Sequence, residues 1–389
     1  MLQQRVFGLA CGYADCNDAA RLADDAIHKL LVGRDPLDGP RLASQPTLSR
    51  FENAVTWTEL RDMAHVLADT VIEQQRRGRK GRATEITVDL DPTDDPTHGQ
   101  QELTFFNGHY DSWCYLPLLA FLTFNDDVEQ YLCAAILRPG NAPATRGARG
   151  TLIRLLDMLR VAFPRARFLV RLDGGFATPE MLDRLDAEPG VDYVVAMAEN
   201  AVLTRCAEPP MVEARSQSEA SGQTEHVYTE ARYAARTWPH ERRIVIKAEV
   251  VRLPGREPRD NPRFVITNLR QTPRFVYERV YCARGDIENR IKELHDGLQI
   301  GRTSCGRFWA NQLRVLLTAA AYVLMQELRL RAARTACARA QVTTLRERLL
   351  KLGVHVLGSV RRIVLHLPTS TPFLDAWRHI ALALGARPG

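Results

Sequence analysis

Tyr281-Cys-Ala-Arg284-Gly-Asp-Ile-Glu288-Asn-Arg290-Ile-Lys292-Glu-Leu-His295 is a stretch whose pattern predicts a helix with two different faces. It contains no proline, and its single glycine costs a helix only about 1 kcal/mol relative to alanine. Apolar side chains recur at positions 287, 291 and 294, the spacing of a face that packs on a core. Positions 281, 284, 288, 292 and 295 fall on another, shared face. That second face carries one carboxylate among a phenol, a guanidinium, an ammonium and an imidazole.

Two interpretations of this polar face are open. Charged runs on helices are most often solvated faces with ion pairs between successive turns. The alternative is one acid ringed by groups that bind phosphate, which suits a metal-binding carboxylate held beside a nucleic-acid backbone.

The same stretch resembles a signature of bacterial insertion-sequence DDE transposases, Y-x2-R-x3-E-x6-K, through Tyr281, Arg284 and Glu288. At the last signature position His295 stands in place of lysine, and a neutral imidazole binds phosphate less reliably than an ammonium. The resemblance covers the chain from its N-terminus to about residue 330 and implies a ribonuclease-H-like core with cut-and-paste DNA chemistry. Chains of that family commonly begin earlier than Met1 does here, which leaves open a further N-terminal piece.

Composition agrees with a globular DNA-binding protein. The chain has 389 residues, 45% of them hydrophobic and 25% charged, with a net charge of +6. This length suits two or three domains, and the positive charge favours a polyanionic partner. The eight cysteines form no CxxC pair, so neither a zinc site nor a disulfide framework is indicated. Because no signal peptide and no apolar run of about 18 residues is present, we expect a cytoplasmic protein, nucleoid-associated when it binds DNA.

Two further acids follow predicted strands. Apolar residues alternate at 86, 88 and 90, which predicts a strand whose other face carries Asp89 and Asp91 near its end. A second predicted strand, 168–172, runs directly into Asp173 and two glycines that would let another backbone or a phosphate approach closely. Strand-terminal aspartates are also ordinary turn formers, but two acids on one strand face are harder to explain in that way.

The resemblance assigns the catalytic, metal-binding acids to Asp91, Asp173 and Glu288, with Asp89 as the alternative for the first. Phosphodiester chemistry of this kind is served by two Mg²⁺ ions, with Mn²⁺ as a substitute, acting on the attacking and leaving oxygens. Such ions take carboxylate oxygens, so two aspartates and one glutamate are sufficient protein ligands.

DNA contacts are expected mainly from the signature helix. Arg284 would grip a backbone phosphate and Tyr281 would donate a hydrogen bond, with Lys292 and His295 further along the same face. Trp238 lies among basic residues and would either stack on an unpaired base or anchor its own small core.

We expect the α/β fold class: a ribonuclease-H-like mixed sheet flanked by helices, with a helical N-terminal region and a mostly β insertion before the last catalytic helix. The N-terminal region would either read DNA through a helix-turn-helix or form a plain helical subdomain. Within it one helix is predicted at 18–32. Residues 204–224 are interpreted as a polar loop, and Gly358-Ser359 as the turn of a late hairpin. The expected regions are 1–82 (N-terminal, DNA-binding), 83–204 and 274–332 (catalytic), 205–273 (insertion) and 333–389 (helix-hairpin-helix tail).

These features together predict a transposase that cleaves the ends of an insertion sequence and transfers the freed strands. Its partners would be double-stranded DNA, both element terminal repeats and target, and a second copy in a homodimer; no membrane is expected. The alternatives are a metal-dependent nuclease without strand transfer and an inactive DNA-binding relic.

Overall fold

The computed structural model describes residues 1–359 and 362–386. Its centre is a large mixed sheet in which β1 pairs antiparallel with β5 and parallel with β7. β6 extends the sheet beyond β5, and β8 lies parallel to β7 on the other side, giving the order β6-β5-β1-β7-β8. The bounds are β1 Glu85–Pro92, β5 Leu118–Phe124, β6 Tyr131–Ile136, β7 Arg167–Leu172 and β8 Val191–Met197. This order confirms the expected ribonuclease-H-like sheet.

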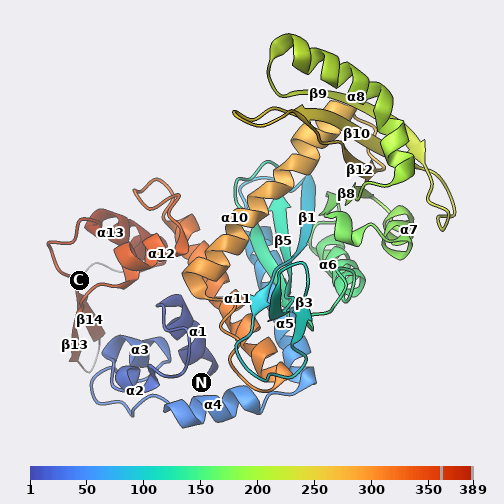
Figure 1. The fold of residues 1–389 in the computed structure, drawn as a ribbon. Coiled ribbons are helices and arrows are strands. Elements are labelled where there is room, and N and C mark those ends of the chain that lie inside the picture. Colours follow the sequence, from blue (N-terminus) through green and yellow to red (C-terminus); the bar gives the residue numbers. More distant parts are fainter. Residues whose placement is uncertain (360–361, 387–389) are drawn as a thin grey trace.

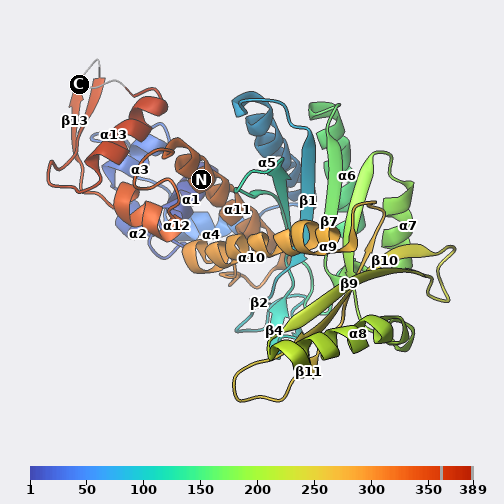
Figure 2. The same cartoon turned by 90° about the horizontal axis from the view of Figure 1, so that it is seen from above.

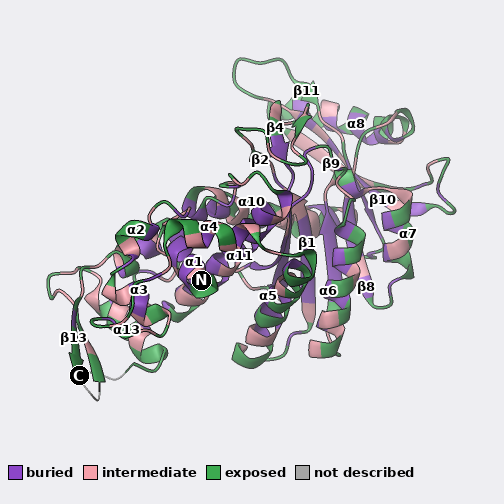
Figure 3. Cartoon of the chain, turned by 90° about the horizontal axis from the view of Figure 1, so that it is seen from below, coloured by how far each residue is buried: buried purple, intermediate pink, exposed green. Residues whose placement is uncertain are grey.

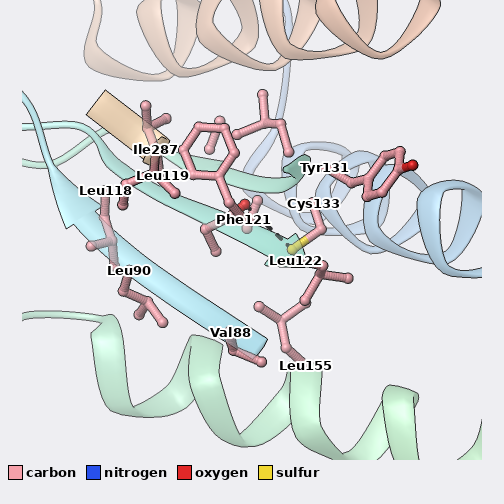
Figure 4. Packing of buried hydrophobic residues seen from close by; sticks show 14 of the residues in the cluster. Val88, Leu90, Leu118, Leu119, Phe121, Leu122, Tyr131, Cys133, Leu155 and Ile287 are labelled. Carbon is pink, nitrogen blue, oxygen red and sulfur yellow. Dashed lines mark hydrogen bonds between the residues drawn. The ribbon is translucent and has the colours of Figure 1, made fainter. Parts of the chain in front are cut away.

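Alternation along β1 separates a core face from a polar face. Val88 and Leu90 are fully buried and point toward α6 (Ala148–Ala162), which carries Leu155 (Figure 4). Asp89 and Asp91 point away from that core, as period-two alternation requires. The acids therefore share one face of the sheet, as predicted.

Helices cover the sheet around this core. α11 (Phe308–Arg331) is buried along most of its length and packs on β6 and on α5 (Trp57–Gly78). α7 (Pro179–Ala187) begins at Thr178, whose side chain accepts a hydrogen bond from the Met181 amide, and packs on β8. Buried residues gather in the central strands and the helices on them (Figure 3).

The N-terminal region is helical, as expected, but one predicted helix is divided. Residues 18–32 form α2 (Ala19–Leu22) and α3 (Ala26–Leu31), because the Asp25 side chain caps a new helix by accepting a hydrogen bond from the His28 amide. α3 packs on α1 (Leu2–Ala10), whereas α4 (Gln45–Asn53) and α1 both pack on α11. A DNA-reading role for these helices stays a prediction.

The insertion extends the central sheet through further antiparallel strands. β12 (Arg263–Thr267) pairs with β8, and β10 (Arg242–Val251) pairs with β12, with β9 (Glu225–Tyr233) and with β11 (Arg259–Asp260). The predicted loop at 204–224 was wrong, because α8 occupies Ala201–Ser221 and packs on β9 and β10 (Figure 1). Asn200 caps this helix, and its buried residues recur at helical spacing despite Pro209 and Pro210. The two prolines disguised that spacing in the sequence.

A three-stranded sheet branches off beyond β1, and the tail completes the chain. The small sheet comprises β2 (Asp95–Pro96), β3 (Phe105–Asn107) and β4 (Ser112–Tyr115). The tail contains α12 (Val342–Leu345), the hairpin β13 (His355–Ser359) and β14 (Arg362–His366), and α13 (Leu374–Ala383). Gly358 and Ser359 belong to strand β13, so the predicted turn position was wrong; residues 360 and 361 lie outside the described residues. Among the described residues, no helix is long and apolar enough to cross a membrane.

Candidate active site

The signature stretch lies in one helical segment that runs from Pro273 to Gly297 across the sheet (Figures 1 and 2). Ile287 and Leu294 are fully buried, which confirms the predicted core face. The segment is not a uniform α-helix. It contains α9 (Pro273–Phe275), wide π-type turns at Val276–Tyr281 and Glu293–Gly297, tight 3₁₀ turns at Cys282–Gly285, and α10 (Asp286–Lys292). These changes in turn width alter the rotation between successive side chains.

The structure brings Asp91 and Asp173 together. Asp91 lies near the end of β1 and Asp173 directly follows β7, and these two strands are parallel neighbours whose ends meet at one edge. The Arg284 Nη2 atom lies 2.6 Å from Asp91 Oδ1 and 3.7 Å from Asp173 Oδ2. One cationic nitrogen of the signature segment thus contacts both strand-end acids.

The turn after Asp173 explains its two glycines. The Gly175 amide donates a hydrogen bond of 2.8 Å to Asp173 Oδ1, which fixes the carboxylate. A Cβ atom added at Gly175 would lie only 2.9 Å from the Cβ atom of Ala144. Glycine therefore allows the loop before α6 to approach the acid site closely.

The electrostatics of the site favour an additional cation. Burial, together with the charges of Asp173 and Glu288, raises the pKa of Asp91 from 3.8 to about 6, although Arg284 opposes the shift. The Asp91 and Asp173 carboxylates outweigh burial at Arg284 and raise the pKa of its guanidinium. One guanidinium thus faces two carboxylates, with a third close enough to influence them. Such crowding of like charges is characteristic of functional sites.

Glu288 is close to these acids but is not gathered with them. Its side chain is exposed on α10, one helical turn beyond Arg284, and makes no ion pair or hydrogen bond within the described residues. Among the residues described, no three histidine, cysteine or acidic side chains are arranged as a ready metal site. The donor set nevertheless suits a hard divalent cation, since two carboxylates already meet at one positive charge and a third is free nearby.

Asp89, the alternative first acid, is occupied elsewhere. Arg171 donates from Nε and Nη2 to its two oxygens at 2.8 and 2.6 Å, and both side chains are buried. Arg171 Nη1 also donates to the carbonyl of Val280, 3.2 Å away. This pair attaches the signature segment to the sheet beside the acid site, which favours Asp91 over Asp89 as the first acid.

The predicted DNA-contacting residues are not all on one surface. Lys292 is exposed, whereas the half-buried ring of Tyr281 packs on Tyr277 with ring centroids 5.5 Å apart. His295 Nε2 lies 3.0 Å from the Thr93 hydroxyl, and burial lowers the pKa of this imidazole, which disfavours its charged form. Contacts of these side chains with DNA stay a prediction.

Trp238 lies in the core of the insertion. Its residue is only 9% exposed; it packs edge-on against Tyr233, and the Arg242 guanidinium lies 4.9 Å from the centre of its ring. This placement favours the anchoring interpretation, and base stacking by Trp238 stays a prediction.

The sequence did not reveal a buried charge network at the other end of the signature segment. Glu293 accepts hydrogen bonds from Arg329 (2.7 Å), Arg290 (3.2 Å) and the Tyr322 hydroxyl (3.0 Å). Arg329 and Arg290 also contact Glu129, at 2.6 and 3.3 Å. The network joins the segment to α11 and to the β5–β6 connection. Because its members are far apart in the sequence, no local motif predicts it.

Comparison with protein families agrees with this geometry. Residues 1–387 match the model described as transposase DDE domain group 1, which is nearly the whole chain. A search of curated proteins gave no match. Both strand-end aspartates contact the Arg284 guanidinium, and Glu288 lies one helical turn beyond Arg284 on the signature segment. With this arrangement and the match over nearly its whole length, the chain belongs to the DDE transposase family.

Proposed function

We propose that this protein cleaves DNA at the ends of an insertion sequence and joins the freed 3′-hydroxyl groups to target DNA. The observation that carries the proposal is the meeting of Asp91 and Asp173 at one positive charge, beside the exposed Glu288. Family membership supports transposase chemistry in general, and this geometry supports the choice of residues.

In the proposed reaction Asp91, Asp173 and Glu288 hold divalent cations, Mg²⁺ or Mn²⁺. Bound in pairs, such ions stabilise the charge on the attacking and leaving oxygens of a phosphodiester. The protein contributes the placement of the acids: two strand ends fix the aspartates, and the Arg171–Asp89 pair holds the signature segment against them. Arg284 and the exposed Lys292 supply positive charge for the DNA backbone at the same segment.

The proposed partner is double-stranded DNA, with a second copy of the chain pairing the two element ends. We place the N-terminal helices in end recognition, because α1 and α4 pack on α11, α3 packs on α1, and none of the three contributes a group to the acid site. The proposed compartment is the cytoplasm, with DNA as the site of action.

The test is a cleavage and joining assay on duplex DNA that carries the terminal repeats, with and without Mg²⁺. We expect metal-dependent nicking at the ends followed by joined products, and loss of both in Asp91→Asn, Asp173→Asn and Glu288→Gln. Folding of each variant is checked by thermal melting. Cleavage without joining would identify a nuclease instead, and metal-dependent DNA binding without cleavage would identify an inactive relic. Near wild-type cleavage by any one variant would remove that residue from the site.

A further inference from the structure

Arg284 occupies the position that a cation bound by Asp91 and Asp173 would need. Its Nη2 atom contacts both carboxylates, at 2.6 and 3.7 Å, and its side chain is only 12% exposed. Its buried Nε has no hydrogen-bond partner among the residues described. Arg138 Nη2 is likewise buried without a partner in the described part of the chain, so what distinguishes Arg284 is its contact with both strand-end acids.

The other arginines around the site are held differently. Arg171 donates to Asp89 and to the Val280 carbonyl, and Arg138 donates to backbone carbonyls that include those of Leu116 and Ala144. Both have partners that need not change when the acid site is filled. Arg284 alone of these three contacts the two strand-end acids.

We infer that Arg284 is the resident cation of the DNA-free protein and that a DNA phosphate draws it away, which couples metal binding to DNA binding. The inference rests on the proposed function, since it takes the two aspartates as metal ligands. A guanidinium stays protonated in proteins, so it leaves the carboxylates by moving rather than by losing its proton. A backbone phosphate offers the guanidinium a bidentate acceptor in place of the two carboxylate contacts that Nη2 alone makes here.

The displacement of Arg284 links the free energy of metal binding to that of DNA binding. While Arg284 bridges the acids, a divalent cation must displace it, so metal affinity is low without DNA. When DNA engages the guanidinium, the carboxylates become free and metal affinity rises. Coupling is reciprocal, so metal strengthens DNA binding by the same factor, and couplings of this kind are typically about 5–150-fold.

The test measures Mn²⁺ binding by following free Mn²⁺ with electron paramagnetic resonance, with and without a saturating DNA duplex. Wild type is compared with Arg284→Gln, which removes the positive charge between the two aspartates. It is also compared with Arg284→Lys, which keeps the charge but lacks the planar guanidinium. Arg279→Gln is the matched control, because Arg279 is exposed on the same helical segment and pairs with no acid among the described residues.

We expect DNA to tighten Mn²⁺ binding by roughly tenfold in wild type and in Arg279→Gln. In Arg284→Gln, Mn²⁺ should bind about as tightly without DNA as wild type binds it with DNA, and DNA should add little. Arg284→Lys should retain part of the coupling. Thermal melting confirms that each variant is folded.

Two results would overturn the inference by itself: unchanged or weaker DNA-free metal binding in both folded Arg284 variants, or full coupling in Arg284→Gln. Absence of Mn²⁺ binding in every protein, with and without DNA, would instead overturn the proposed function and the inference with it. The two failures are therefore distinguishable.

Discussion

The helical segment from Pro273 to Gly297 takes part in two arginine–carboxylate sites that differ in the burial of their side chains and in the number of their ion-pair partners. Near its C-terminal end, the side chains of Glu293 and Arg329 are 2% and 5% exposed, and Glu293 accepts bonds from several donors. Near its middle, Arg284 alone bridges Asp91 and Asp173, whose side chains are 15% and 31% exposed.

The difference separates a structural role from a functional one. Charges that are buried and hydrogen-bonded to several oppositely charged partners fix one packing arrangement, because removing either partner leaves an uncompensated charge. Charges that crowd together with too few partners, at the edge of solvent, are available for an additional ligand. The two sites should therefore respond in opposite ways to mutation.

The largest expected effect is at the buried site. Arg329→Ala removes bonds to both Glu293 and Glu129 and should lower the free energy of unfolding by about 3–5 kcal/mol. Urea denaturation of the two proteins measures the difference. Arg331→Ala is the control, because this nearby exposed arginine pairs with Glu327 alone among the described residues and its loss should cost less than about 0.5 kcal/mol. A loss below about 1 kcal/mol for Arg329→Ala would break the contrast between the sites.

Asp95 provides an intermediate case, because it is fully buried but has one partner. Thr303 donates to Oδ2 at 2.7 Å, Oδ1 has none among the residues described, and burial raises the pKa of this carboxyl from 3.8 to about 7. The folded protein thus holds this proton more tightly than the unfolded chain does. Its stabilising contribution is full below the unfolded pKa of 3.8, is already partly lost at pH 5, and continues to fall until pH has risen through 7.

Asp95→Asn should remove that pH dependence. As pH rises from 5 to 8, the difference in unfolding free energy between the variant and wild type should shift in favour of the variant by on the order of 2 kcal/mol. Urea denaturation at both pH values measures the gain, with Asp69→Asn, at an exposed position of α5, as control. An equal difference from wild type at the two pH values would show that Asp95 does not titrate in this window.

The smallest expected effect is at the acid site. Asp91→Asn removes a carboxylate whose pKa burial has raised to about 6, and leaves Arg284 in contact with Asp173. We expect the unfolding free energy at pH 8 to change by less than about 1 kcal/mol, because the lost ion pair and the relieved burial of charge offset each other. A loss comparable to that of Arg329→Ala would mean that the acid site is structural.

The sequence predicted those elements whose hydrophobic pattern over a few residues matches the secondary structure that they adopt in the fold. Asp91 and Asp173 follow strands that read clearly from alternation and apolar runs, so their meeting could be anticipated from parallel strand ends. Glu293 could not be anticipated as a structural charge, because its partners Glu129 and Arg329 lie in distant elements. The position of His295 was unpredictable for a similar reason, since its contact with Thr93 depends on turn widths within the segment.

Local signals also misled where they were mixed. Two adjacent prolines concealed α8, although its capping residue Asn200 and its buried spacing are both present in the sequence. Trp238 among basic residues had two interpretations, and only tertiary packing shows the ring against Tyr233.

The central claim is that Asp91, Asp173 and Glu288 together bind a divalent cation when DNA is present. The most direct measurement is a Mn²⁺ titration of the DNA complex of wild type and of Asp91→Asn, Asp173→Asn and Glu288→Gln, with Asp94→Asn as control. The account predicts that each of the three substitutions weakens Mn²⁺ binding by at least roughly tenfold, which is about 1.4 kcal/mol, while Asp94→Asn leaves it within about twofold. Wild-type Mn²⁺ affinity in folded, DNA-bound Asp91→Asn, Asp173→Asn or Glu288→Gln would contradict it.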